Sequence, residues 1–375
     1  MKSHHHLHKR ILSLDVFRGM IIALMILVNT IVVSPFTTLD HASWHGCHLA
    51  DLVFPSFIFV VGMSLVLSLS KQLKQGTAKS ILVHKIVIRA LIIMAFGVFL
   101  NMFPHHMTLD TIGSIRFLGV LQRIALCYLF AALAYLTLST QIQILLIAIL
   151  LAGYWWIMMY IPLPGFGSGH LSPEGNWAAY IDRLLIPPIH LYTKSYDPEG
   201  ILSTIPAIAT ALLGNITSIW LMYKGSIYKK FWGLVIGGSV CLIGGWLWGQ
   251  WFPINKALWT SSYVLWTAGW ALYIYAICYW LIEIKHMTAW SKPFEVFGLN
   301  AIVAFIGHVM FFKIQLSVLM TCSNGANCSL RTYILQTLFG ELSLPYASLL
   351  YGLLSVLFWL GILWVLYRNK ILIRI

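Results

Sequence analysis

Long uninterrupted runs of apolar residues dominate the sequence, and short polar segments separate them. About ten of these runs approach the length of roughly 20 residues that an α-helix needs to cross a membrane. They fall near 11–34, 50–70, 86–103, 116–138, 143–162, 201–223, 231–250, 260–282, 294–315 and 346–367. Apolar and polar residues do not alternate within them, as they would in a transmembrane barrel. The pattern predicts an all-α, polytopic integral membrane helical bundle with about 10 transmembrane helices.

Positive charges are spread unevenly over the predicted loops. Most of the 24 Lys and Arg residues lie at the two ends of the chain and near 71–85, 224–230 and 285–292, in alternate loops. Cytoplasmic loops carry such an excess, so both termini are predicted to be cytoplasmic, with 1–10 as a cytoplasmic tail. The longest polar interval, 163–200, then becomes an extracytoplasmic loop, either a carbohydrate-binding segment or a packed lid. We expect residues 1–375 to form a single transmembrane domain.

Composition supports a membrane protein and changes the meaning of its charge. Hydrophobic residues make up 59% of the chain and charged residues 9%, whereas soluble domains carry about 25% charged residues. The formal charge of +13 comes mainly from the cytoplasmic loops, so we expect membrane lipids and no nucleic acid as partners. No C-x-x-C, H-E-x-x-H or Walker A pattern occurs, which argues against structural zinc and a P-loop. Cys322 pairs either with Cys328 or with a rival partner, Cys47.

Ionisable residues inside the apolar runs indicate a functional site, because such groups are costly in a membrane. Asp15 and Arg18 lie three residues apart in the first run, where they either neutralise each other on one helix face or contact a ligand. Arg123 lies about two turns into its run, too deep to reach water easily. It is expected to face the bundle interior and to pair with an anion, either a carboxylate or a ligand phosphate.

A second group of polar residues crowds the junction between the first two runs. It consists of His41, His45, His48 and Asp51. The imidazoles would serve either as metal ligands or, singly, as a general base near neutral pH. Together with the buried polar groups of the later runs, these residues predict a polar cavity inside the bundle.

Six long motifs occur in one order along most of the chain. They are LDVFRGM, HASWHGCHLADLVFPSFIFVVG, RFLGVLQRIAL, DPEGILSTIPA, NKALWTSSYVL and FGLNA. In this combination the sequence resembles the transmembrane acyltransferase family that includes heparan-α-glucosaminide N-acetyltransferase, in its compact bacterial form, over about residues 10–310. The resemblance implies transfer of an acetyl group from cytoplasmic acetyl-CoA to an amino sugar or glycan across the membrane. The implied location is the inner membrane of a bacterium.

The resemblance also implies roles for individual residues. His41 matches the active histidine, as catalytic base or acyl carrier, and Asn29 matches its partner asparagine. Asp51 would orient His41, bind the cationic acceptor or cap the second helix. Acetyl-CoA is the implied co-substrate, and no metal is expected. The candidates for binding acetyl-CoA are Arg116, Gln122, Arg123, Trp259, Ser261 and Ser262. Those for the acceptor are Asp197, Glu199, Asn255, Lys256 and Asn300, although the two acids would alternatively fix the DPEG turn.

Other functions are compatible with the sequence. A transporter of an amino sugar or small anion would also bury polar groups, but it would usually show an inverted repeat, which we do not find. An O-acyltransferase of an envelope polysaccharide would use the same donor and a hydroxyl acceptor. A scaffold without activity would not need so many embedded polar residues. A homodimer is compatible with each of these functions.

Overall fold

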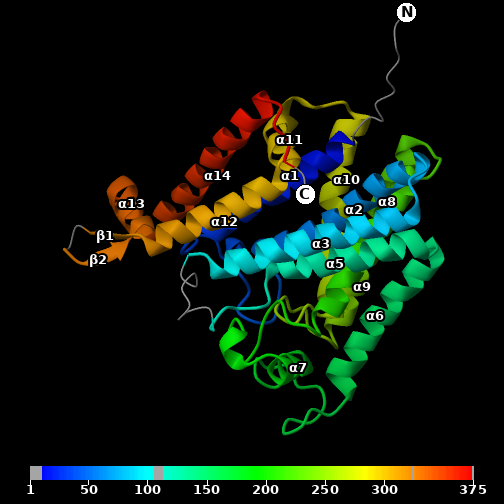
Figure 1. The fold of residues 1–375 in the computed structure, drawn as a ribbon, viewed down its shortest axis with the longest axis horizontal. Helices are drawn as coiled ribbons and strands as arrows, with labels where there is room; N and C mark the ends of the chain where they lie inside the picture. The colour runs from blue at the N-terminus through cyan, green and yellow to red at the C-terminus, as the bar shows by residue number, and fades with distance from the viewer. Residues whose placement is uncertain (1–10, 105–112, 323–324, 374–375) are drawn as a thin grey trace, which may run out of the picture.

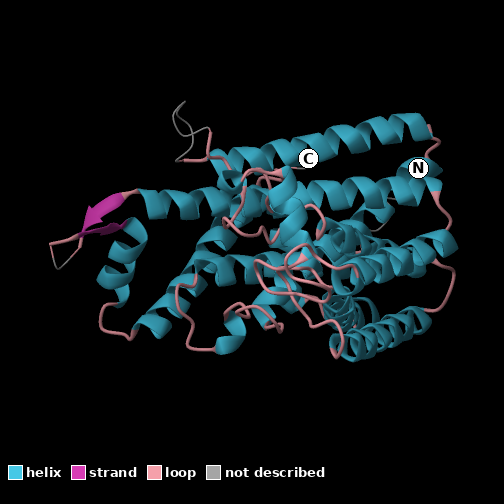
Figure 2. Cartoon of the chain, turned by 90° about the horizontal axis from the view of Figure 1, so that it is seen from below, coloured by secondary structure: helices cyan, strands magenta, loops and turns pink. Residues whose placement is uncertain are grey.

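The computed structural model describes residues 11–104, 113–322 and 325–373, and nearly all of its regular structure is helical (Figures 1 and 2). The predicted tail, 1–10, lies outside the described residues. Within the described residues, 9 helices are long and apolar enough to cross a membrane. They are α1 (Leu12–Thr30), α2 (Val53–Lys74), α3 (Lys79–Met102), α5 (Val120–Thr137), α6 (Thr140–Tyr160), α8 (Thr204–Met222), α9 (Ile227–Gly249), α10 (Ser261–Tyr279) and α14 (Leu344–Arg368). Short turns η2 (Leu49–Leu52) and η4 (Trp280–Ile284) extend α2 and α10. The prediction of an all-α polytopic bundle is confirmed.

A further apolar stretch forms helices that meet at a sharp bend. The sequence predicted one run at 294–315, but the structure has η5 (Ala289–Ser291), α11 (Lys292–Leu299) and α12 (Ala301–Ser317), with a 71° bend at Asn300. The Asn300 amide donates to Ile371 O at 3.1 Å and accepts from Ile373 N at 3.0 Å. The break therefore binds the C-terminal segment. Counted as one span, the pair brings the total to the predicted ten.

The two described ends of the chain meet on one side of the bundle. Ile11, just before α1, and Ile373 line the same cavity. An even number of crossings places both ends of a chain on the same side of the membrane. This arrangement agrees with the prediction that both termini are cytoplasmic. Glycines let α1 and α11 pack closely there, because a Cβ added at Gly298 would lie 1.9 Å from Asp15 O.

The predicted extracytoplasmic loop, 163–200, is an ordered cap at the opposite end, where α7 lies in Figure 1. It contains α7 (Trp177–Leu185) and η3 (Pro188–His190). Arg183 ties the cap together by donating to Ser195 O at 2.6 Å and to Glu174 O at 2.9 Å. A Trp177 Nε1 bond to Ile161 O, 2.8 Å long, joins it to the end of α6. These contacts favour the packed lid, one of the two alternatives that the sequence left open.

A small arm projects from the bundle in both views (Figures 1 and 2). It carries the strands β1 (Leu319–Thr321) and β2 (Asn327–Ser329), which pair antiparallel, followed by α13 (Leu330–Phe339). Cys322 and Cys328 form a disulfide across this hairpin, whereas Cys47 is a free thiol. The pairing of Cys322 with Cys328 is thus confirmed over its rival.

Candidate active site

The loop between α1 and α2 folds around the carboxylate of Asp51, which is 1% exposed. Its Oδ2 accepts backbone N–H groups from Ala42 at 3.1 Å and His48 at 3.0 Å, and the His48 bond is part of a capping box at η2. Its Oδ1 lies 2.7 Å from Nδ1 of His41. A carboxylate can only accept, so His41 carries a proton on Nδ1. Asp51 therefore both caps the second helix and orients His41, two of the three roles that the sequence left open.

His41 faces the outer solvent although its partner is buried. The imidazole is 51% exposed, and with Nδ1 committed to Asp51 its Nε2 keeps a lone pair when the ring is neutral. A half-exposed imidazole held by a buried carboxylate is the arrangement of a general base or of a nucleophile.

Lys256 joins this pair from a distant part of the chain. Its Nζ lies 3.3 Å from Asp51 Oδ1 and 3.1 Å from His41 Nδ1. The loop after α9 that carries it is held by its own polar groups, since Asn255 Oδ1 accepts from Leu258 N at 2.8 Å. Tyr263 on α10 fixes the other side by donating to Asp51 O at 2.6 Å. Asp51, His41 and Lys256 thus form one cluster.

The other two histidines of the junction have separate partners. His45 Nδ1 lies 3.4 Å from Asn255 Nδ2, and His48 Nδ1 lies 3.0 Å from Asp40 O. The three rings do not converge on one point. Among the described residues, no group of three or more His, Cys, Asp or Glu side chains is arranged to hold a metal ion.

Asn29 stands at the outer end of α1, one residue before the helix ends, with an exposed side chain. No hydrogen bond joins it to His41 in the described part of the chain. Its pairing with His41 stays a prediction.

Arg116 forms ion pairs with Asp197 and Glu199, the two acids that the sequence analysis predicted to bind the acceptor. Its guanidinium binds both oxygens of Asp197, with Nε at 2.8 Å from Oδ2, and also reaches Glu199. Asp197 further accepts from Tyr192 N at 2.9 Å and Glu199 N at 2.9 Å. Burial alone would lower the pKa of Arg116, but the two carboxylates raise it above its ordinary value. These contacts favour the alternative in which Asp197 fixes the DPEG turn.

Arg123 faces the bundle interior, as predicted, and is 1% exposed. Its Nη2 donates to Gly200 O at 3.1 Å and to Ser203 Oγ at 2.5 Å, and the guanidinium lies 5.0 Å from the ring of Trp259. Nε and Nη1 have no partner among the described residues. The expected anion is replaced by neutral oxygens and an aromatic face. Within the described ranges, Arg123 is the buried side chain with the most nitrogen atoms that lack a hydrogen-bond partner.

The remaining residues proposed for acetyl-CoA bind backbone carbonyls instead. The side chain of Gln122 donates to Phe117 O at 3.1 Å, that of Ser261 to Leu151 O at 2.7 Å, and that of Ser262 to Phe252 O at 2.5 Å. Their hydrogen bonds tie loops and helices together near the outer half of the bundle.

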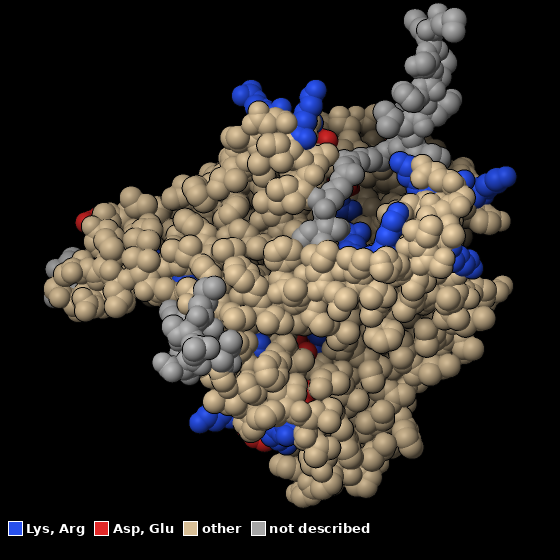
Figure 3. All heavy atoms as spheres, viewed as in Figure 1, with Lys and Arg blue, Asp and Glu red and all other residues tan. Residues whose placement is uncertain are grey.

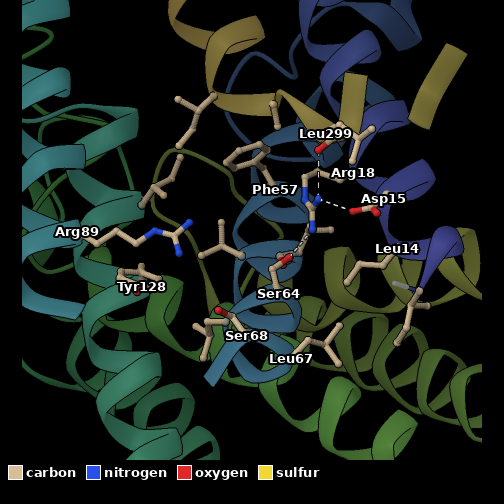
Figure 4. Close-up of a pocket in the computed structure, with 18 of the residues that line it drawn as sticks. Leu14, Asp15, Arg18, Phe57, Ser64, Leu67, Ser68, Arg89, Tyr128 and Leu299 are labelled. Atoms are coloured by element: carbon tan, nitrogen blue, oxygen red, sulfur yellow. Dashed lines mark hydrogen bonds and ion pairs between the residues drawn. The ribbon is translucent and has the colours of Figure 1, made fainter. Parts of the chain in front are cut away.

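A basic cavity of about 690 Å³ opens at the end of the bundle where the two chain ends meet. Figure 3 shows a hollow on this part of the surface with Lys and Arg side chains around it. Lys71 and Lys74, in the last turn of α2, line it, as do Arg18 and Arg89 deeper in the bundle. Arg18 donates to Asp15 at 2.8 Å and to Ser64 Oγ at 2.7 Å, while Arg89 reaches in from the opposite wall beside Tyr128 (Figure 4).

The sequence predicted a polar cavity inside the bundle, but it did not predict the residues that line this one. Lys71 and Lys74 were interpreted only as markers of topology, and Arg18 either as the ion-pair partner of Asp15 or as a contact to a ligand. Arg89 lies in the apolar stretch KIVIRALII, so the rule that singled out Arg123 would have found it.

Helix α2 connects the cavity to the His41 cluster. Phe57 lines the inner part of the cavity and Lys74 its rim, a rise of about 26 Å along the helix. From Phe57 to Asp51 the helix rises about 9 Å further. Phe54 and Trp259 lie in this interval with ring centroids 5.0 Å apart. The basic cavity and the His41 cluster thus lie at opposite ends of α2, and the contact between Phe54 and Trp259 lies between them.

Comparison of the sequence with known proteins relates this chain to a family. The profile described as "Heparan-alpha-glucosaminide N-acetyltransferase, catalytic" matches residues 10–233. This protein belongs to the heparan-α-glucosaminide N-acetyltransferase family. The human heparan-alpha-glucosaminide N-acetyltransferase is 31% identical over 354 residues, which cover 80% of this chain and 53% of the human protein. The mouse protein is 31% identical over 351 residues with the same coverage. The chain thus spans about half the length of these relatives.

The family profile covers part of the site. His41, Asp51, Arg123 and the lysines of the cavity rim lie within 10–233, so they belong to the region that the heparan-α-glucosaminide N-acetyltransferase profile describes. Lys256 lies beyond the profile. Only the three-dimensional structure places it beside His41.

Proposed function

We propose that this protein is a transmembrane acetyltransferase. It takes an acetyl group from acetyl-CoA in the cytoplasm and transfers it to the amine of a glucosamine-type sugar or glycan on the other side of the membrane. The proposed location is the inner membrane of a bacterium. One observation carries the proposal: α2 has a basic cavity at its cytoplasmic end and the His41–Asp51 pair at its outer end.

The cavity suits acetyl-CoA in charge and length. Phosphates seek cationic partners, and Lys71 and Lys74 line the cavity near its mouth. Arg18 and Arg89 add positive charge along the walls, while Phe57 and neighbouring aliphatic residues line the inner part. A chain that enters with its phosphates at the lysines therefore points its thioester along α2 towards Asp51.

The outer cluster suits removal of a proton from an amine. An ammonium group must lose its proton before it can attack a thioester, and Nε2 of His41 would accept it. Asp51 stabilises the resulting imidazolium through Nδ1. We favour this direct transfer over an acetyl-histidine intermediate, with the Asn29 amide as a donor to the developing oxyanion. Arg123, with its unused donors, would bind the donor or acceptor along the path.

The test is acetyl transfer from labelled acetyl-CoA to glucosamine by the purified protein in lipid nanodiscs. Replacing His41 by Ala should lower the rate by about 100-fold or more, since general bases contribute 10²–10⁴-fold. His170→Ala is the matched control, because this exposed histidine lies in the outer cap away from the cluster. Transfer that is equally fast in His41→Ala and in the wild type would exclude His41 as the base.

Two further readouts separate the alternatives. Labelled protein trapped with donor alone and bound through a histidine would replace direct transfer by the acetyl-histidine route. Uptake of glucosamine into proteoliposomes without acetylation would replace the acetyltransferase by a transporter. Acetylation of polysaccharide hydroxyls with no transfer to amines would instead identify an O-acyltransferase.

A further inference from the structure

A primary amine lies within the cluster that the proposed reaction uses. Lys256 Nζ is 3.1 Å from Nδ1 and 3.4 Å from Nε2 of His41. The side chain is 27% exposed, so it borders the outer site without being sealed into the core. A thioester bound beside His41 for direct transfer would therefore also lie beside Nζ, and bound groups react at separations of about 3–3.5 Å.

The surroundings of Lys256 combine burial with a single close acid. Asp51 Oδ1 lies 3.3 Å from Nζ, and Glu199 and the Cys47 thiol contribute at longer range. Burial lowers the pKa of Lys256, and these groups only partly oppose the shift. A larger neutral fraction makes the amine a better nucleophile than an exposed lysine at the same pH.

We infer that Lys256 is a self-acetylation site, which the enzyme modifies when acetyl-CoA is present and no acceptor amine is available. The inference rests on the proposed function, because it uses the same donor and the same histidine. In this reaction Nζ of Lys256 takes the place of the acceptor amine.

The step balances without any further reagent. The Nζ lone pair forms a bond to the acetyl carbon, and the C–S bond of acetyl-CoA breaks. The ammonium proton passes to His41 Nε2 before the attack, and one N–H proton of the new amide ends on the CoA thiolate. The products are the free thiol of CoA, Nε-acetyl-Lys256 and one proton, which His41 Nε2 releases to solvent.

Acetylation would change the cluster in a defined way. It removes the positive charge of Lys256 and with it the ion pair to Asp51. It also places an acetyl amide beside His41, where the acceptor would bind. The modified enzyme should therefore transfer acetyl groups slowly. In the absence of acceptor, self-acetylation would thus inhibit the enzyme.

The experiment is incubation of the full chain in nanodiscs with isotope-labelled acetyl-CoA and no acceptor, followed by peptide mass spectrometry. Lys256 should gain the label at least about tenfold faster than Lys194, an exposed lysine of the outer cap. His41→Ala should slow labelling of Lys256 and leave that of Lys194 unchanged. Preincubation with acetyl-CoA should reduce the later rate of transfer to glucosamine, with each protein compared with the same protein without preincubation. The reduction should be larger in the wild type than in Lys256→Arg.

The outcomes separate this inference from the proposed function. Active transfer to glucosamine with an unlabelled Lys256 overturns the inference and leaves the function standing. Equal labelling of Lys256 and Lys194 overturns it as well, because it shows chemical acetylation without the site. No label on glucosamine and none on Lys256 overturns both. If Lys256→Arg does not fold, labelling of the wild type alone still decides.

Discussion

Asp51 is the residue on which the outer site depends. It accepts two backbone N–H groups, orients His41 and pairs with Lys256. The sequence indicated the link between His41 and Asp51 because both belong to one short loop. It placed Lys256 only among acceptor-binding candidates, because a residue 215 positions from His41 meets it only through packing of the helices.

Replacement of Asp51 by Asn should lower the rate of acetyl transfer by about 10-fold to 100-fold. The amide keeps the shape but removes the charge that stabilises the imidazolium, and second-shell partners of this kind have effects of that size. The measurement is kcat with glucosamine as acceptor. Asp40→Asn, an exposed acid in the same loop, serves as the control. Equal rates in the Asp51 and Asp40 variants would contradict the role given to Asp51.

Asp182 in the outer cap should make stability depend on pH. Burial raises its pKa to about 6, against the opposing hydrogen bond from Ile201 N. Between about pH 4 and pH 6 the unfolded chain releases this proton more readily than the folded one, so stability should fall as pH rises. The shift from 3.8 to about 6 corresponds to about 3 kcal/mol at most.

The check is thermal unfolding of the wild type and of Asp182→Asn at pH 5 and pH 7.5. The variant should lose less stability over this interval than the wild type. Glu174→Gln changes an exposed acid of the same cap and should behave like the wild type. An identical pH dependence in Asp182→Asn would show that Asp182 ionises without cost to the fold.

At the scale of elements, close packing of α11 on α1 shapes the basic cavity. Gly19 and Gly298 face the other helix's backbone, and Arg18 donates to Gly298 O at 3.2 Å. The hydropathy pattern predicted α1 correctly because a span is a local property. It missed the bend at Asn300, since that amide bonds to Ile371 and Ile373, a contact that no local pattern contains.

Gly298→Ala should destabilise the protein by about 1–3 kcal/mol, the usual range for overpacking. A Cβ there would lie 1.9 Å from Asp15 O, so one of the two helices must move. Gly361→Ala is the matched control, because a Cβ on this glycine of α14 meets nothing within 4 Å. Thermal unfolding in detergent measures both variants. Similar unfolding temperatures would mean that α1 and α11 separate without cost.

At the scale of the whole molecule, the bundle holds two polar sites on opposite sides of an apolar core. The basic cavity collects positive charge, whereas the cluster at the other end of the bundle pairs its lysine with an acid. A donor bound in the first can react at the second only by extending along α2, past Phe54 and Trp259. The proposed reaction therefore needs separate binding sites for donor and acceptor.

Replacement of both Lys71 and Lys74 by Gln should raise the KM for acetyl-CoA about fivefold, as expected for two partly exposed charges. The KM for glucosamine should not change, because the acceptor binds at the other end of α2. Lys230→Gln, near the start of α9 and not among the residues that line the cavity, is the control. The effect should shrink at high salt. A change in the KM for glucosamine alone would contradict two separate sites.

The sequence by itself determined the membrane-spanning architecture, because hydropathy is a property of short segments. Loop charge and motifs, which are equally local, predicted the orientation and the role of His41. The tertiary structure decided which polar residues meet. It gave Asp197 and Glu199 to Arg116, brought Lys256 to His41, and gathered Arg18, Arg89 and the lysines of α2 around one cavity. A polar residue in a helix can face any neighbour until packing sets the rotation and register of that helix, and packing depends on the whole chain.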